Sequence, residues 1–326
     1  MEGLVRRILS TLFVTACVLV ATPTTGHAAA TWTKAGTTVA VACGSSTLSQ
    51  AANWYFPATT TPKALVYLQH GFSRSNANMD ALAGKYADAG FLVFAPTLPS
   101  STAGNNCAVN NTGDNTAFLN NVAGWLGELT TSTSNLAKSY TTAAGKAGRT
   151  GQAPPAKYVI AGHSAGGDAV TYIANRLRTT YPAAFANLKF LQLLDPVLSP
   201  NGTNMATGLA GLAGTSLPIY AISSPPYTAN SQASGTTELI KDVPRSFLGV
   251  RLTTGSHCDA EGASTNFLCT LLGGTSKAAN VTALQTFAVN WANDAVAGTS
   301  TAIYYPGGTY YQGLLTAGTI TTLSGS

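Results

Sequence analysis

Residues 158–166, Tyr-Val-Ile-Ala-Gly-His-Ser-Ala-Gly, decide the fold. The first four are apolar and follow two prolines, as is typical of the start of a short buried strand. Beyond the stretch, apolar residues return at helical spacing as Val170, Ile173, Ala174 and Leu177. The pattern therefore predicts a strand, a tight turn that carries Ser164, and a helix.

In the turn, Gly162, Ser164 and Gly166 alternate with other residues. Glycines at its two ends let strand and helix approach where a Cβ atom would collide. The serine hydroxyl would then lie at the N-terminus of the helix, where developing negative charge is favoured. We therefore predict that Ser164 is a nucleophile. The simpler alternative is an ordinary strand-to-helix loop that contains a serine.

Strand-like and helix-like segments alternate along the rest of the chain. Apolar runs predict strands over 37–42, 53–56, 64–69, 91–94, 188–194, 217–222 and 247–252, with 247–252 as the last strand. Helical spacing predicts helices over 76–89, 116–136 and 281–296. Such alternation is typical of an α/β protein with a mostly parallel central sheet flanked by helices. Ligands bind such a sheet at the carboxyl ends of its strands, where we find Ser164, Asp195, His257 and Gly71-Phe72.

Histidine is the usual base that takes a proton from a serine nucleophile, and the chain contains four histidines. His27 belongs to the N-terminal segment. His163, beside the serine, is expected to point away from it, and His70 is expected to support its own loop. Only His257 follows the last predicted strand, from which a loop can return to Ser164. We predict that His257 is the general base.

A carboxylate is needed to orient that histidine, and Asp195 is the best placed. It ends the apolar strand 188–194, where a charged group needs a partner, and the Nδ1–H of His257 is a suitable one. The next predicted strand leads into residues 223–226, Ser-Ser-Pro-Pro, which hold no carboxylate. The other candidates, each of which could also be a solvated surface charge, are Asp168, Glu238 and Asp242.

These motifs resemble those of secreted serine esterases of the α/β-hydrolase superfamily, over residues 39–298. The G-H-S-A-G turn and Asp195-Pro196-Val197 are similar to those of plant chlorophyllases and platelet-activating-factor acetylhydrolases. Gly71-Phe72 is similar to a step in cutinase-type polyester hydrolases, although residues 164–168 read Ser-Ala-Gly-Gly-Asp where those enzymes usually read Ser-Met-Gly-Gly-Gly. The resemblance implies an α/β-hydrolase fold and a triad of Ser164, His257 and Asp195.

In such enzymes two backbone N–H groups hold the oxyanion that forms during acyl transfer. The residue after the serine, Ala165, would supply one of them. The loop after the strand at 64–69 would supply the other, from Phe72. We also place the side chains of Phe72, His163 and Tyr227 in the substrate pocket.

Four cysteines remain after the N-terminal segment, and an even number in an exported protein suggests disulfides. Three pairings of Cys43, Cys107, Cys258 and Cys269 are possible. We expect Cys258–Cys269, because this short loop would brace the segment next to His257, and therefore also Cys43–Cys107. The sequence has no C-x-x-C pair and no histidine at ligand spacing, so we predict no metal and no cofactor.

Residues 1–30 have the parts of a signal peptide: Arg6-Arg7, an apolar core, and Ala28-Ala29-Ala30 before the cleavage point. The core is too short for a lasting membrane span. A lipid anchor on Cys17 is disfavoured because the residues after it stay apolar. We therefore expect a secreted protein whose catalytic domain covers 31–298.

Residues 299–326 form a tail rich in tyrosine and glycine. Its sequence over 304–311, Tyr-Tyr-Pro-Gly-Gly-Thr-Tyr-Tyr, predicts a hairpin packed on the domain. The alternative for these aromatic residues is a patch that binds a sugar or a polymer.

The composition of the chain limits the kinds of molecule that it is expected to bind. Hydrophobic residues make up 45% of the chain and charged residues only 9%, with a formal net charge of +5. There is no basic cluster interleaved with aromatic residues, so nucleic acid is not an expected partner. We expect a monomer that acts on a small-molecule or polymeric ester.

A cap domain would be inserted at 200–217 or 227–246, and both segments are too short for a large one. We therefore predict an open cleft, which suits bulky or polymeric esters. The leading function is hydrolysis of carboxylic esters through an acyl-enzyme on Ser164. The same residues could cleave amides or peptides, and a chain of this fold could also be a non-catalytic binding module.

Overall fold

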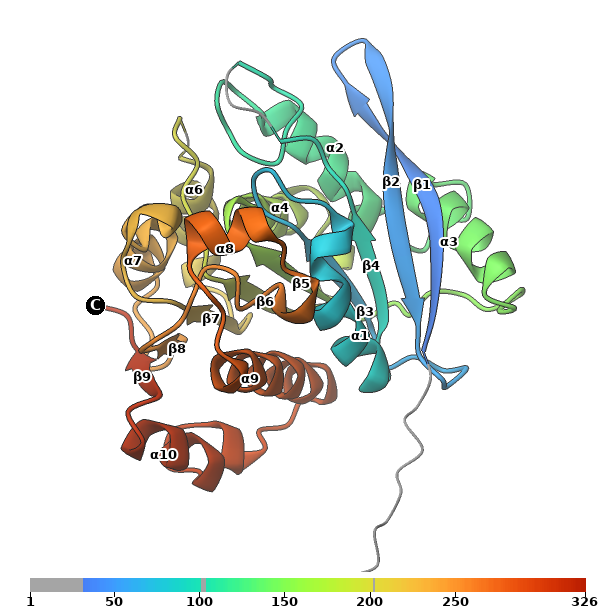
Figure 1. The fold of residues 1–326 in the computed structure, drawn as a ribbon. Helices are drawn as coiled ribbons and strands as arrows, with labels where there is room; N and C mark the ends of the chain where they lie inside the picture. The colour runs from blue at the N-terminus through green and yellow to red at the C-terminus, as the bar shows by residue number, and fades with distance from the viewer. Residues whose placement is uncertain (1–31, 101–103, 202) are drawn as a thin grey trace, which may run out of the picture.

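The computed structural model of the 326-residue chain describes residues 32–100, 104–201 and 203–326. The segment 1–30, with its predicted signal peptide and Cys17, lies outside the described residues. The described part is built on a nine-stranded sheet in the order β1-β2-β4-β3-β5-β6-β7-β8-β9, covered by helices on both faces (Figure 1).

The sheet is mostly parallel, as predicted. The six central strands β4, β3, β5, β6, β7 and β8 run parallel to one another, whereas β1, β2 and β9 join the two edges in antiparallel pairs. The strands are β1 (Thr33–Cys43), β2 (Ser46–Phe56), β3 (Leu65–Gln69), β4 (Leu92–Pro96), β5 (Tyr158–His163), β6 (Leu188–Leu194), β7 (Ile219–Ser223), β8 (Gly249–Leu252) and β9 (Ile320–Leu323).

Two helical layers sandwich this sheet. The longer helices are α1 (Asp80–Asp88), α2 (Thr116–Gly127), α3 (Asn135–Lys146), α4 (Ala165–Thr180), α6 (Asn204–Ala213), α7 (Ser234–Asp242), α9 (Ala278–Ala297) and α10 (Thr309–Thr316). Two short ones are α5 (Pro182–Phe185) and α8 (Phe267–Gly273). Helices α2, α3, α4 and α6 pack on one face, and α1, α9 and α10 pack on the other.

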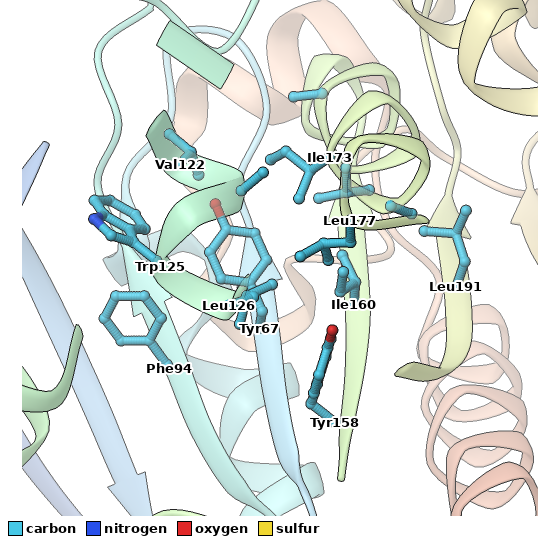
Figure 2. Packing of buried hydrophobic residues seen from close by; sticks show 14 of the residues in the cluster. Tyr67, Phe94, Val122, Trp125, Leu126, Tyr158, Ile160, Ile173, Leu177 and Leu191 are labelled. Carbon is cyan, nitrogen blue, oxygen red and sulfur yellow. The ribbon is translucent and has the colours of Figure 1, made fainter. Parts of the chain in front are cut away.

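Strand β3 shows why the sheet must be covered twice. All five of its residues are buried, and alternate side chains point to opposite faces. Leu65 and Tyr67 enter the core under α2 and α4, whereas Val66 and Leu68 enter the core under α1 and α9. Figure 2 shows the first of these cores, in which aromatic and branched side chains from strands and helices interlock.

In the N-terminal half of the chain, the structure differs from the sequence prediction in two places. The strands expected over 37–42 and 53–56 are longer and form one antiparallel hairpin, which turns at Gly44 with a positive φ of 58°. The helix expected over 116–136 is two helices, α2 and α3. Residues 128–134 are rich in threonine and serine, and the Ser134 side chain accepts the Ala137 N–H to begin α3.

The expected hairpin at the C-terminus is wrong. Residues 302–304 form a short 3-10 helix, α10 follows, and β9 pairs antiparallel with β8, so 247–252 is not the last strand. A Cβ atom on Gly308 would lie 1.9 Å from the Ala302 carbonyl oxygen, so Gly308 packs on the preceding turn. Tyr311 of α10 is fully buried against the core under α9. The tail thus extends the central sheet.

The two segments where a cap would be inserted hold α6 and α7, which join the helical layer around α4. Both predicted disulfides, Cys43–Cys107 and Cys258–Cys269, are present. Among the described residues, no helix combines the length and the apolar character that crossing a bilayer requires.

Candidate active site

The turn between β5 and α4 holds Ser164 in a backbone conformation that residues other than glycine rarely adopt. Its φ is 57° and its ψ is −128°, which is strained for a non-glycine residue. Close packing enforces the turn: a Cβ atom on Gly162 would lie 2.3 Å from the Gly166 carbonyl oxygen, and one on Gly166 would lie 2.5 Å from the His70 carbonyl oxygen. The predicted strand, turn and helix are therefore confirmed.

Ser164, His257 and Asp195 come together at the carboxyl ends of β5, β8 and β6. The Ser164 Oγ lies 2.9 Å from the His257 Nε2. The His257 Nδ1 lies 2.6 Å from the Asp195 Oδ2. These distances allow the hydroxyl to donate to the imidazole and the imidazole to donate to the carboxylate.

Asp195 is buried, and its carboxylate accepts hydrogen bonds from Ser224 and Asn230 as well as from His257. The Ser224 N–H donates to Oδ1 at 2.9 Å and the Ser224 hydroxyl donates to Oδ2 at 2.5 Å. The buried Asn230 amide adds longer contacts of 3.3 and 3.4 Å. Burial alone would raise the pKa of Asp195, but the hydrogen bonds from His257 and Ser224 outweigh it, so this pKa lies below its usual value.

The loop that carries His257 is tied down on both sides. The His257 N–H donates to the Gly273 carbonyl at the end of α8 over 3.0 Å. The next residue, Cys258, is bonded to Cys269 in the middle of α8. The His163 Nε2–H donates to the His257 carbonyl oxygen over 2.8 Å.

The two other described histidines are buried and neutral. His163 packs its ring beside His257, with centroids 4.7 Å apart, and burial followed by the His257 charge lowers its pKa to about 3. It also lines the cavity beside Ser164. His70 donates through Nδ1 to the Gly71 carbonyl oxygen, and burial lowers its pKa to about 4.

The alternative acids lie elsewhere. Asp168, expected as a possible surface charge, is fully buried in α4 and accepts from the Ser199 hydroxyl over 2.5 Å. Burial raises its pKa to about 6. Glu238 and Asp242 lie on α7, where each pairs with Lys241. The His257 side chain therefore pairs with Asp195 alone among these carboxylates.

The loop after β3 passes directly beside the serine. A Cβ atom on Gly71 would lie 2.6 Å from the Ser164 Cβ, so this glycine permits the approach. Phe72 follows, and its backbone N–H has no hydrogen-bond acceptor among the described residues. Ala165 is the first residue of α4, where helical N–H groups have no intrahelical acceptor. Their role as oxyanion donors remains a prediction.

A cavity of about 780 Å³ opens beside Ser164 and His257. Its apolar lining includes Phe72, Val197, Leu198, Leu268 and Leu272, and its polar lining includes Asn110, Thr112 and Ser199. Among the described residues, no group of three or more His, Cys, Asp or Glu side chains could hold a metal ion.

Tyr227, which is predicted to lie in the substrate pocket, is not among the residues that line this cavity. Thr228 and Ala229 line the cavity instead. The Tyr227 hydroxyl donates to the Gly273 carbonyl oxygen over 3.0 Å, which turns the ring toward the His257 loop. Tyrosine hydroxyls generally seek such a partner when they are partly buried.

Sequence reasoning missed the groups that support the site. Ser224 and Asn230 surround Asp195, and Arg74 forms an ion pair with Glu261 at 2.7 Å. The Glu261 side chain is fully buried and the Arg74 side chain is only 9% exposed. The one sequence signal for these groups is the Ser-Ser pair that follows β7.

Comparisons with known proteins identify the fold. The sequence matches no protein-family profile and no curated protein. A ferulic acid esterase from Streptomyces cinnamoneus is similar in structure at 12% identity, with 94% of this chain matching 99% of that chain at a TM-score of 0.56. A structure of fungal esterases from Rhizomucor miehei also matches at 12% identity, over 82% of this chain and 85% of that chain, with a TM-score of 0.50.

A match to the esterase Est22 spans 59% of this chain and 64% of that chain at a TM-score of 0.39. At these low identities the likeness to the first two structures shows the fold alone. The chain has an α/β-hydrolase fold with a mostly parallel sheet flanked by helices, as predicted.

Proposed function

We propose that the protein is a serine hydrolase that cleaves carboxylic esters through an acyl-enzyme on Ser164. The observation that carries the proposal is the chain of two hydrogen bonds, from Ser164 Oγ to His257 Nε2 and from His257 Nδ1 to Asp195 Oδ2. The strained conformation of Ser164 supports it, because strain of this kind is concentrated at functional sites.

In the first half of the reaction His257 takes the Ser164 proton as Oγ attacks the ester carbonyl. The N–H groups of Phe72 and Ala165 would hold the oxyanion of the tetrahedral intermediate. Each such donor typically stabilises the transition state by about 2.7–4 kcal/mol. His257 then gives its proton to the leaving alcohol, and the acyl group stays on Ser164.

In the second half a water molecule replaces the alcohol and His257 acts as its base. Asp195 keeps the imidazole in one orientation and stabilises the imidazolium that forms in both halves. Because the pKa of Asp195 is low, its carboxylate is ionised wherever the imidazole is neutral. His163 contributes no proton, since burial keeps it uncharged.

Substrates with bulky acyl groups, including polymeric esters, suit the open cleft. In the described chain, the two segments where a cap would be inserted form α6, which packs on α4, and α7, which packs on α6, and this supports an uncapped cavity. We also propose that the protein is secreted. The two disulfides and the signal-like composition of residues 1–30 support this.

The test compares wild type with Ser164→Ala on a short-chain p-nitrophenyl ester and on an aminopeptidase substrate. We expect wild type to turn over the ester and the variant to lose about 10⁴-fold or more of this activity. Turnover of only the amide substrate would assign a peptidase instead. Equal ester turnover by both proteins would show that Ser164 is not the nucleophile.

A further inference from the structure

The apolar side chains that the protein leaves in solvent are concentrated at the mouth of the cavity. Six large hydrophobic residues are exposed among the described residues. Four lie on α8 (Phe267, Leu268, Leu271 and Leu272) and one, Phe72, lies on the loop beside Ser164. The sixth is Ile303, on the turn that packs with α9 and α10.

We call Phe267, Leu268, Leu271 and Leu272 the α8 ridge. Residues four apart on a helix are neighbours, so the ridge has two rows. The inner row, Leu268 and Leu272, lines the cavity. The outer row, Phe267 and Leu271, is not part of the lining and is 78% and 64% exposed. The apolar wall of the cavity therefore continues onto the outer surface.

The ridge lies on a helix that is attached to its surroundings at two points. The Cys258–Cys269 disulfide fixes the middle of α8 to the His257 loop. At the start of the helix, the Asn266 side chain accepts the Cys269 N–H over 3.1 Å and receives a hydrogen bond from Arg74 over 3.2 Å. Arg74 is itself held by the buried Glu261. These contacts hold α8 in the orientation in which its inner row lines the cavity and its outer row faces solvent.

Charge limits what could cover the ridge. Residues 265–276 contain no charged side chain. The one charged side chain that lines the described cavity is Arg74, which is already paired with Glu261. An uncharged apolar surface would remove the outer row from water.

One wall of the cavity is apolar and another is polar but uncharged, and this combination fits a polymer with repeating ester groups. The ridge gives an apolar wall, and Thr112 and Ser199 belong to a polar but uncharged part of the lining. A polyester chain carries ester groups at intervals along an apolar backbone and can match both walls. A fatty acyl chain has no polar group beyond its own ester.

We propose that the α8 ridge docks the protein on the surface of a solid, uncharged polyester and so delivers a chain segment to Ser164. The outer row contacts the solid, and the inner row guides the segment into the cavity. This proposal rests on the proposed ester hydrolysis, which names the bond that is cleaved. It adds a separate binding step, which can be measured without turnover.

The experiment uses the mature chain with Phe267→Gln and Leu271→Gln combined, since glutamine is a good helix former. The matched control is Ile303→Gln, which removes an exposed hydrophobic side chain far from α8 in the sequence. Adsorption to polycaprolactone particles is measured in a Ser164→Ala background, so that the surface is not consumed. Hydrolysis of the particles, of a tributyrin emulsion and of soluble p-nitrophenyl butyrate is measured with Ser164 intact.

We expect the double variant to adsorb to polycaprolactone about tenfold or more weakly and to hydrolyse it correspondingly slowly. Its kcat/KM on p-nitrophenyl butyrate should stay within about twofold of wild type, and Ile303→Gln should behave as wild type throughout. Unchanged adsorption, or an equal loss in the control, would overturn the proposal. A loss confined to the tributyrin emulsion would assign the ridge to a liquid lipid interface and also overturn it.

The result separates the two proposals. If the wild-type protein cleaves no ester but adsorption in the Ser164→Ala background still depends on Phe267 and Leu271, the docking surface stands and the ester hydrolase does not. If soluble ester is cleaved while adsorption is independent of the ridge, the hydrolase stands and the docking surface does not.

Discussion

The serine and the histidine of the site are held by different means. Ser164 lies on a turn whose shape is set by backbone contacts: added Cβ atoms on Gly162 and Gly166 would meet carbonyl oxygens at 2.3 and 2.5 Å. His257 lies on a loop whose position depends on side chains and distant segments. These are the disulfide to α8, the Gly273 carbonyl and the His163 ring.

Because of this difference, we expect changes in the two regions to affect activity and the free energy of unfolding differently. A change in the serine turn meets backbone that cannot rotate away, so it should disturb the fold of the whole sheet edge. A change in the histidine loop meets side chains that can shift, so the loop can loosen while the sheet stays folded. Activity should then fall without a matching fall in the free energy of unfolding.

The largest effect is expected where the two regions meet, at Asp195→Asn. The amide cannot accept the Nδ1–H while keeping all its other hydrogen bonds, so the imidazole loses its orientation. We expect kcat on a soluble ester to fall about 10⁴-fold. Ser224→Ala, which removes one donor to Asp195, is the milder comparison. A similar loss in both variants would contradict this ranking.

Adding one methyl group to each region tests the contrast directly. Gly166→Ala places Cβ against the His70 and Gln69 carbonyl oxygens at 2.5 and 2.7 Å. We expect the free energy of unfolding to fall by about 3 kcal/mol, at the upper end for overpacking. Gly273→Ala meets the Cys258 Sγ and the His257 Cβ at 2.9 and 3.0 Å.

Both of these contacts are with side-chain atoms, which can shift. Gly273→Ala should therefore lower kcat, and it should lower the free energy of unfolding by less than Gly166→Ala does. Denaturant unfolding and ester kinetics on the same samples distinguish the two variants. The comparison fails if Gly273→Ala destabilises the protein as much as Gly166→Ala does.

We expect removal of the two disulfides to show the same contrast between stability and activity. In the chain-entropy description, a closed loop of 64 residues contributes about 4 kcal/mol and one of 11 residues about 3 kcal/mol. Cys43→Ser with Cys107→Ser should therefore lower stability more. Cys258→Ser with Cys269→Ser should lower kcat more, about tenfold, because α8 no longer fixes His257. Thermal unfolding and kcat are measured for both pairs.

The smallest effect concerns Asp168, on the serine side. Burial raises its pKa to about 6 in the folded protein, above the value of about 3.9 for an unfolded chain. Between these values the folded state binds more protons, so stability falls as pH rises from about 4 to about 6. Asp168→Asn should remove about 1–3 kcal/mol of this pH dependence.

The measurement is denaturant unfolding of wild type and Asp168→Asn at several pH values from 4 to 7. The Asp168→Asn variant should gain stability relative to wild type as pH rises, with kcat little changed because Asp168 does not contact His257. Parallel stability curves would show that Asp168 does not titrate in this range.

Much of the site was readable in the sequence because the decisive residues end strands. Parallel strands bring their carboxyl ends to one edge, so Ser164, Asp195 and His257 had to lie near one another once the strand pattern was recognised. The disulfide pairing followed from the proximity of Cys258 to His257. The orientation of Tyr227 could not be read in the sequence, because it depends on a hydrogen bond to Gly273, which is 46 residues away.

The sequence by itself determined the alternation of strands and helices in the central sheet, the serine turn and the ends of the central strands, since these depend on local spacing and on glycine. The tertiary structure alone decided the fate of the tail. Tyr311 finds a buried place under α9 and β9 finds a free edge at β8. It also decided that Asp168 is buried and that the leucines of α8 stay exposed, because burial is a property of the whole packed chain and not of any one segment.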